Sequence, residues 1–111
     1  MAVDRATAGR QLLTYEITTY SLRHRNTGAL GGGIAMQQYR IMDEQAHAFL
    51  TACAEQTGTT WTEPIESVAR TALALIDGFT LRWLVDRESD SIVGELDDMA
   101  GIIAARAVGN P

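Results

Sequence analysis

The sequence predicts an all-α domain built from four helices. Apolar residues recur at intervals of three and four along most of the 111-residue chain, as they do on one face of a helix. The residues that break helices lie between these runs, and no stretch gives a convincing strand. The composition, with 46% hydrophobic and 21% charged residues, is that of an ordinary globular protein. A chain of this length is expected to fold as one domain.

The first helix is expected at residues 6–24. It has apolar side chains on two sides, so we expect both sides to be contacted: Leu13, Ile17 and Tyr20 on one, and Leu12, Tyr15, Thr19 and Leu22 on the other. The glycines at positions 28, 31, 32 and 33 then interrupt the pattern, because each costs roughly 1 kcal/mol relative to alanine in a helix. This segment is predicted to be a loop.

The second helix is expected at residues 33–56 and has a single apolar face. That face consists of Ala35, Tyr39, Met42, Ala46, Phe49, Leu50 and Cys53. Gly58 is expected to stop this helix. Thr62 is expected to cap the next one with its hydroxyl, and Pro64 suits a first turn, where its missing N–H matters little.

The third helix, expected at residues 63–87, is the most informative part of the chain because it is apolar on two opposite sides. With an advance of about 100° per residue, one face holds Ile65, Ala72, Ile76, Phe79 and Trp83, and the reverse face holds Ala74, Gly78, Leu81 and Val85. A helix at the edge of a monomeric domain needs only one apolar stripe. We therefore expect the second stripe to be buried by another copy of this chain.

The fourth helix is expected at residues 91–107, with Ser89 or Asp90 as its cap. It too carries two stripes. Ile92, Leu96, Met99 and Ile103 form the larger one, and Gly94, Gly101, Ala105 and Val108 form the smaller one. The last two helices are therefore both expected to have two contact faces.

The sequence offers little support for catalysis, a metal or a cofactor. His24 and His47 lie on different helices with no motif around them, and Cys53 lies on an apolar helix face, as an inert buried cysteine does. Asp43, Glu44 and His47 are the nearest approach to a metal-ligand cluster, but one such group on a helix is usually a solvated surface feature. We expect a protein that is not an enzyme and holds no metal or cofactor.

The net charge and the cysteine count limit which classes of partner and which cellular compartment are expected. The net charge of −5 and the pI near 4.8 oppose binding to a phosphate backbone or an anionic membrane. A single cysteine excludes an intramolecular disulfide, and the sequence lacks the apolar run of a signal peptide or a membrane span. A cytoplasmic protein that binds neither nucleic acid nor membrane by itself is expected.

A few large side chains are candidates for a ligand pocket. Tyr and Trp suit a pocket that is apolar yet orients a ligand by a hydrogen bond, although they also fill plain cores. Glu16 lies between two apolar faces, where an unpaired carboxylate would be costly, so it must reach solvent, an arginine or a ligand. The candidate ligand-binding residues are Glu16, Tyr20, Tyr39, Phe79 and Trp83.

The order of the segments is itself informative. QLLTYEITTYSLRHRN is followed by MQQYRIMDEQAHAFLTACAEQTG, then by ESVARTALALIDGFTLRWLVDRES, and finally by a helix of small residues. The most distinctive segment is Leu75–Asp86, and the pairs Tyr15-Glu16 and Gln38-Tyr39 add weaker support to the same pattern. From about Leu12 to Val108, this succession resembles the C-terminal regulatory domain of TetR-type transcriptional repressors.

The resemblance implies that the last two helices of each subunit form a four-helix dimer interface and that the first three surround a pocket for a small, mostly apolar effector. The implied interface residues are Ala74, Gly78, Leu81, Arg82, Val85, Gly101, Ala105 and Val108, and Arg82 is expected to pair with an acidic residue across the two-fold axis.

The family's N-terminal helix-turn-helix, which would bind DNA, has no counterpart in these residues, so we expect a fragment of a longer regulator. The glycines before the second helix also depart from the family pattern. A second interpretation stays open, in which the chain is a helical homodimerisation module with a solid core and no ligand.

Overall fold

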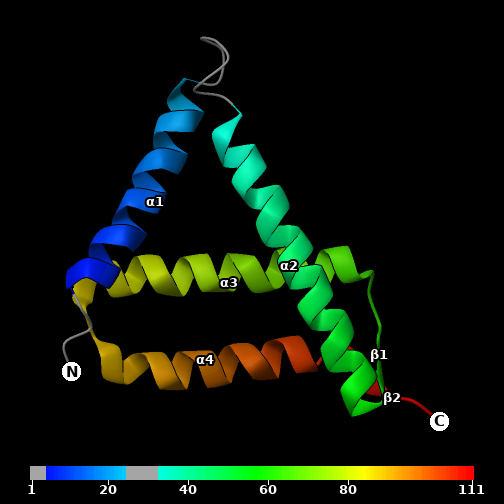
Figure 1. Cartoon of the computed structure of the whole chain (residues 1–111). Helices are drawn as coiled ribbons and strands as arrows, with labels where there is room; N and C mark the ends of the chain where they lie inside the picture. Colours follow the sequence, from blue (N-terminus) through cyan, green and yellow to red (C-terminus); the bar gives the residue numbers. More distant parts are fainter. Residues whose placement is uncertain (1–4, 25–32) are drawn as a thin grey trace.

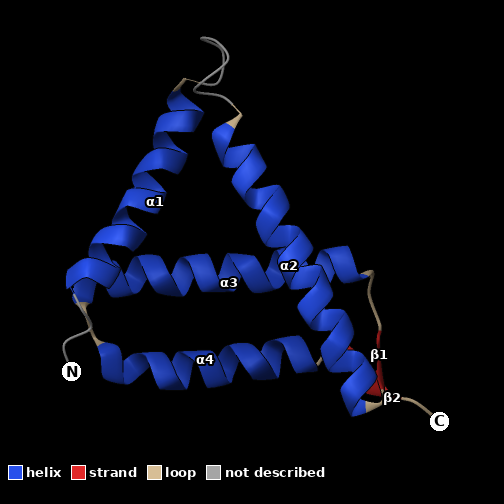
Figure 2. Cartoon of the chain, viewed as in Figure 1, coloured by secondary structure: helices blue, strands red, loops and turns tan. Residues whose placement is uncertain are grey.

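The computed structural model of the protein describes residues 5–24 and 33–111, and this part of the chain is mostly helical (Figures 1 and 2). The four predicted helices are confirmed. They are α1 (Arg5–Arg23), α2 (Ile34–Thr57), α3 (Ile65–Asp86) and α4 (Ser89–Ala104), and two short strands, β1 (Thr59–Trp61) and β2 (Ala107–Gly109), accompany them. None of these helices is long and apolar enough to cross a membrane. Of the predicted glycine loop, only Gly33 falls within the described residues.

The two strands correct the prediction that the chain has none. β1 and β2 pair antiparallel, with Thr59 opposite Gly109 and Trp61 opposite Ala107. Strands of three residues are too short to show alternation in a sequence. They form because the packing of α3 and α4 returns the end of the chain to the end of α2, where Asn110 N–H donates to the Gly58 carbonyl at 2.8 Å. Val108, expected on the fourth helix, therefore lies in β2.

The helix ends agree with the sequence prediction at one point and differ at two. Gly58 ends α2 in the left-handed conformation, with φ 63° and ψ 40°, and donates its N–H to the Ala54 carbonyl, as predicted. Thr62 does not cap α3, because its N–H and its hydroxyl both donate to the Arg106 carbonyl, at 2.7 and 2.9 Å. Pro64 occupies the N-cap position instead. The N-cap of α4 is Glu88, so the predicted caps, Ser89 and Asp90, lie in its first turn.

The helices form a flat, open arrangement (Figure 1). α1 and α2 converge at one end into a projecting arm, whereas α3 and α4 lie side by side at the base, and α2 crosses α3. The molecule measures 51 × 38 × 16 Å and has a radius of gyration of 16.4 Å. A compact domain of this length has a radius of gyration of about 13 Å. The fold is therefore more extended than a self-contained globular domain.

The core is small and lies where α2, α3 and α4 meet. Its buried residues are Leu50, Val68, Ala69 and Ile103, against which Ala46, Trp61, Ile65, Ala72, Leu75 and Met99 pack. The Trp61 indole N–H donates to the Leu50 carbonyl at 3.2 Å, which fixes β1 against α2. The core thus joins the base of the molecule to the lower half of α2.

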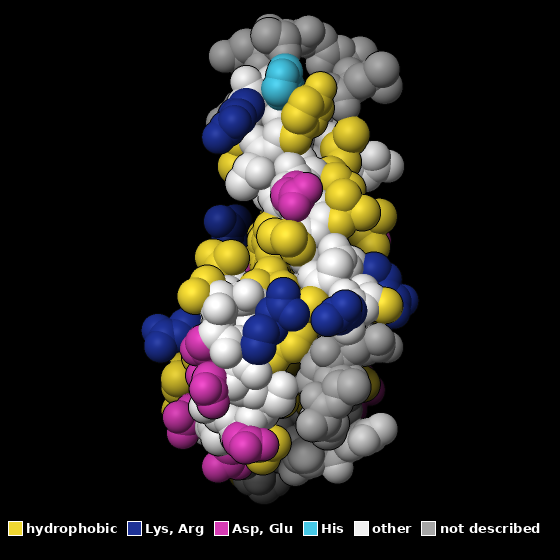
Figure 3. Space-filling view, turned by 90° about the vertical axis from the view of Figure 1, so that its left-hand side faces the viewer, with side chains coloured by type: hydrophobic (Ala, Val, Ile, Leu, Met, Phe, Trp, Pro, Cys, Tyr) yellow, Lys and Arg dark blue, Asp and Glu magenta, His cyan; other side chains and the backbone are white. Residues whose placement is uncertain are grey.

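The arm is much less buried than the sequence predicted. Only Ala8 and Ser21 of α1 are buried, and the Ser21 hydroxyl accepts the Ala35 N–H at 3.3 Å. Leu12, Leu13, Tyr20 and Leu22 are all exposed, so the expected contact on two sides of this helix is wrong for the single chain. Figure 3 shows hydrophobic side chains along this upper region, where an acidic side chain also lies, and further acidic side chains lower down. Phe49, predicted on the inner face of the second helix, is 67% exposed.

The total exposed area agrees with this incomplete burial. The chain exposes 8004 Å². A compact monomer of 12.1 kDa would expose about 6,000 Å². Large apolar side chains contribute to the excess on every helix. The isolated chain therefore exposes more surface than a compact monomer of its mass, and large apolar side chains form part of that surface.

Replacing Leu50 with alanine should lower the free energy of unfolding by roughly 2–4 kcal/mol, because the substitution opens a cavity in a core with few other members. Urea unfolding followed by circular dichroism measures the change. Glu55→Ala is the matched control on the exposed face of the same helix. Equal midpoints for the two variants would contradict the assigned core.

Candidate functional site

A carboxylate on α3 joins three helices through two tyrosines. The Tyr39 hydroxyl on α2 donates to Asp77 Oδ2 at 2.5 Å. The Tyr15 hydroxyl on α1 lies 3.3 Å from Asp77 Oδ1 and 3.2 Å from the Asp77 carbonyl. All three residues are half-buried. This tyrosine–aspartate cluster therefore ties both helices of the arm to α3.

The cluster raises the pKa of both phenols. The hydrogen bond to Asp77 is the main reason that the pKa of Tyr39 rises to about 12, and burial adds to it. Burial is the main cause for Tyr15, whose pKa is also raised by the charge of Asp77. Both tyrosines are therefore neutral donors at physiological pH. The sequence analysis selected Tyr39 as a site residue but did not select Tyr15 or Asp77. The available signal was the position of Asp77, a charged residue inside the apolar run at 75–79.

The five predicted ligand-binding residues are not brought together. Glu16 and Tyr20 lie on the exposed part of α1, where the Tyr20 ring stacks on His24 with centroids 4.0 Å apart. Phe79 and Trp83 line a cavity of about 350 Å³ between the start of α1, the end of α3 and the start of α4. The Trp83 indole N–H donates to the Ser89 hydroxyl at 3.3 Å. The predicted residues thus fall in three separate places.

A larger cavity lies elsewhere, between α2, α3, α4 and the two strands. Its volume is about 790 Å³, within the range of roughly 300–1,000 Å³ typical of small-molecule sites. Phe49, Cys53, Trp61, Ile76 and Met99 are among its lining residues. The sequence analysis placed Phe49, Cys53, Ile76 and Met99 on helix faces, but it could not predict the space between them.

The reverse face of α3 is exposed along its length. Ala74 and Gly78 are exposed, and Leu81 and Val85 are 52% and 78% exposed. The opposite face packs inward and ends at Trp83, which is buried. The two-sided pattern read from the sequence is therefore present in the fold, and we call Ala74, Gly78, Leu81 and Val85 the outer stripe.

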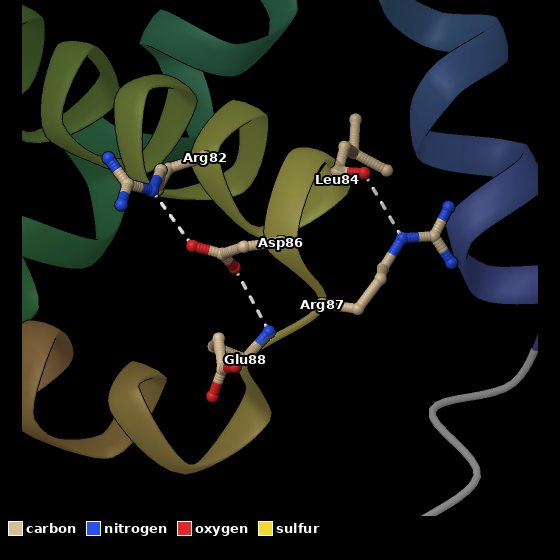
Figure 4. A network of polar contacts seen from close by, with 5 residues as sticks. All are labelled: Arg82, Leu84, Asp86, Arg87 and Glu88. Carbon is tan, nitrogen blue, oxygen red and sulfur yellow. Dashed lines mark hydrogen bonds and ion pairs between the residues drawn. The ribbon is translucent and has the colours of Figure 1, made fainter.

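Charged groups flank the outer stripe at the end of α3 (Figure 4). Arg82 Nε donates to Asp86 Oδ2 at 2.8 Å, and the Glu88 N–H donates to Asp86 Oδ1 at 3.0 Å. These bonds lower the pKa of Asp86, and the Asp86 carboxylate raises that of Arg82. Arg82, expected to pair across a two-fold axis, therefore has its Nε engaged within its own chain.

The remaining predicted interface residues lie near the end of α4 and beyond it. Gly101 and Ala105 are exposed, and Val108 is exposed on β2. Asp43, Glu44 and His47, the nearest approach to a metal-ligand cluster in the sequence, line a hollow of about 410 Å³ with Glu66 and Arg70. His47 Nε2 lies 3.9 Å from Glu66 Oε1. In residues 5–24 and 33–111, no three His, Cys, Asp or Glu side chains converge as metal ligands.

No protein-family model matches the sequence, and no curated protein or solved structure is significantly similar to it. The function must therefore be inferred from the residues and surfaces described above.

Tyr39 should ionise at about pH 12 in the folded protein, and Asp77→Asn should move its pKa back toward the ordinary value of 10.0. Because the pKa of Tyr39 is raised in the folded state, its hydrogen bond to Asp77 stabilises the fold fully below pH 10. This stabilisation is lost as the pH rises toward 12. Ultraviolet titration of the wild-type protein minus that of Tyr39→Phe isolates this one phenol. Ionisation near pH 10 with intact helical circular dichroism would contradict the cluster.

Proposed function

We propose that this chain is the effector-sensing and dimerisation domain of a TetR-like transcriptional regulator. The observation that carries the proposal is α3, which is apolar on two opposite sides, with one side packed inward and the outer stripe exposed. Four apolar or small residues that share one exposed helix face are expected to be covered by a partner in the functional protein. A second copy of the chain is the occupant that we propose.

The outer stripe has the composition of a close helix–helix contact. Ala74 and Gly78 allow the backbones to approach, whereas Leu81 and Val85 supply apolar area. In this proposal Gly101, Ala105 and Val108 extend the same surface. If each subunit removes about 800 Å² from water, the apolar part contributes on the order of 10 kcal/mol gross before association costs. The excess area exposed by the single chain is larger than this requirement.

The sensing role is supported by how the arm connects to α3. Tyr15 and Tyr39 bond to Asp77, and the next residue, Gly78, belongs to the outer stripe. A ligand that shifts α1 or α2 would therefore act on the helix that bears the proposed interface. Its effect on the population of two dimer geometries is bounded by its difference in affinity for them.

DNA binding is assigned to a helix-turn-helix outside this chain, in a cytoplasmic regulator. The net charge of −5 argues against direct contact with a phosphate backbone by these residues. A catalytic role is disfavoured in this proposal because neither His24 nor His47 lies in a catalytic sequence motif.

The alternative is a helical homodimerisation module that binds no ligand. This alternative is favoured because two of the predicted ligand-binding side chains already have hydrogen-bond partners within the chain. Tyr39 bonds to Asp77, and Trp83 bonds to Ser89. The cavity of about 790 Å³ favours the ligand-binding interpretation, because a solid core would leave no such space.

Leu81→Glu should convert the protein from a dimer to a monomer, because it would place a charge in the centre of the proposed interface. Sedimentation equilibrium at micromolar concentration measures the mass. Leu22→Glu is the matched control, an exposed leucine on α1 outside this surface, and it should remain dimeric. A wild-type monomer at high micromolar concentration would refute the proposed interface.

A further inference from the structure

The large cavity has an almost wholly apolar wall. Among the described residues that line it there is no Asp, Glu, Lys, Arg or His. Side chains from three helices and both strands contribute, including Phe49, Leu50, Trp61, Ile76 and Ile103. A charged ligand would lose its hydration here without gaining a counter-charge, which is strongly unfavourable. The wall therefore selects against ions.

Three polar side chains interrupt this wall, and two of them are already engaged. The Thr57 hydroxyl donates to the Cys53 carbonyl at 2.7 Å and lies 2.9 Å from the Thr59 hydroxyl. Gln45 on α2 has no hydrogen-bond partner among the described side chains, and it is exposed at the edge of the cavity. Its amide offers both a donor and an acceptor. One uncharged polar group of a ligand can therefore be matched at this position.

Phe49 shows where the cavity is incomplete. Its ring lines the cavity yet is 67% exposed, although it is a large apolar side chain next to the buried Leu50. An apolar molecule in the cavity would cover this ring and the adjacent face of Ile76, which is also exposed. The gain comes from removing apolar surface of both protein and ligand from water.

We propose that this cavity binds an uncharged, mainly hydrocarbon molecule that carries one hydroxyl or carbonyl group, with that group facing Gln45. The inference rests on the proposed sensing function and gives it a ligand class and a location. The site lies between α2 and α4, away from Glu16, Tyr20 and Tyr39. Ligand binding there would contact α3 and α4 directly, on the side opposite the outer stripe of α3.

Trp61 provides a direct readout, since its ring lines this cavity whereas Trp83 lines the smaller one. The purified chain would be titrated with decan-1-ol and menthol, and with decanoate and decylammonium as charged counterparts, all below the concentrations at which they aggregate. At least one alcohol should change the Trp61 fluorescence and raise the melting temperature, with a Kd at least about tenfold below that of either ion. The Trp61→Phe variant should lose the fluorescence change and keep the thermal shift.

Two substitutions locate the site. Ala100→Phe should place a ring in part of the cavity and weaken alcohol binding by about tenfold or more, whereas Ala52→Phe, exposed on α2 outside the lining, should leave alcohol binding unchanged. Gln45→Leu alters an exposed position outside the core and removes the amide proposed to face the ligand, so it should weaken binding of the alcohols several-fold. Circular dichroism confirms that each variant is folded.

The proposal would be overturned if neither alcohol binds, if the ions bind as tightly, or if Ala100→Phe and Gln45→Leu both leave the affinity unchanged. Sedimentation of the same samples separates this result from the dimer proposal. A dimer that binds no alcohol would refute the ligand site alone, and a monomer that binds one would refute the dimer alone.

Discussion

Helix α3 is the physical constraint on which the rest of the structure depends. Val68, Ala69 and Trp83 are buried on one side of it, and α1, α2 and α4 each pack against it. The buried core takes Leu50 from α2 and Ile103 from α4 against Val68 and Ala69 of α3, so the positions of α2 and α4 follow from the inward face of α3. The same helix also carries the outer stripe. Its two sides therefore link the internal packing to the surface that we propose for association.

Much of this architecture is readable from the sequence because it depends on local rules. Helical periodicity locates the four helices, and the left-handed conformation open to glycine places the end of α2 at Gly58. The strands and the N-terminus of α3 are different, because they depend on residues distant in sequence. Thr62 is a good capping residue by local criteria, yet the Arg106 carbonyl takes both of its donors. Tertiary contact overrides local preference at that point.

The candidate site was harder to predict than the fold. The type of a side chain suggests a ligand role, but the volume between helices depends on crossing angles that periodicity does not specify. Tyr39 and Trp83 have the expected polar groups, and these groups bond within the chain. Phe49 was predicted to lie in the core because it falls on the apolar face of α2, but the open side of the base leaves it without a neighbour to cover it. Such exposed apolar residues are informative only once the structure is known.

The pairing of β1 with β2 has a consequence for the order of folding. Trp61 meets Ala107 only after the chain has passed through the whole of α3 and α4, so the pairing is among the least local contacts in the molecule. Closing so long a loop is entropically costly until the intervening helices have formed and docked. Thr59, Trp61 and Ala107 also line the large cavity. Its wall is therefore completed late in folding, only after β2 has paired with β1.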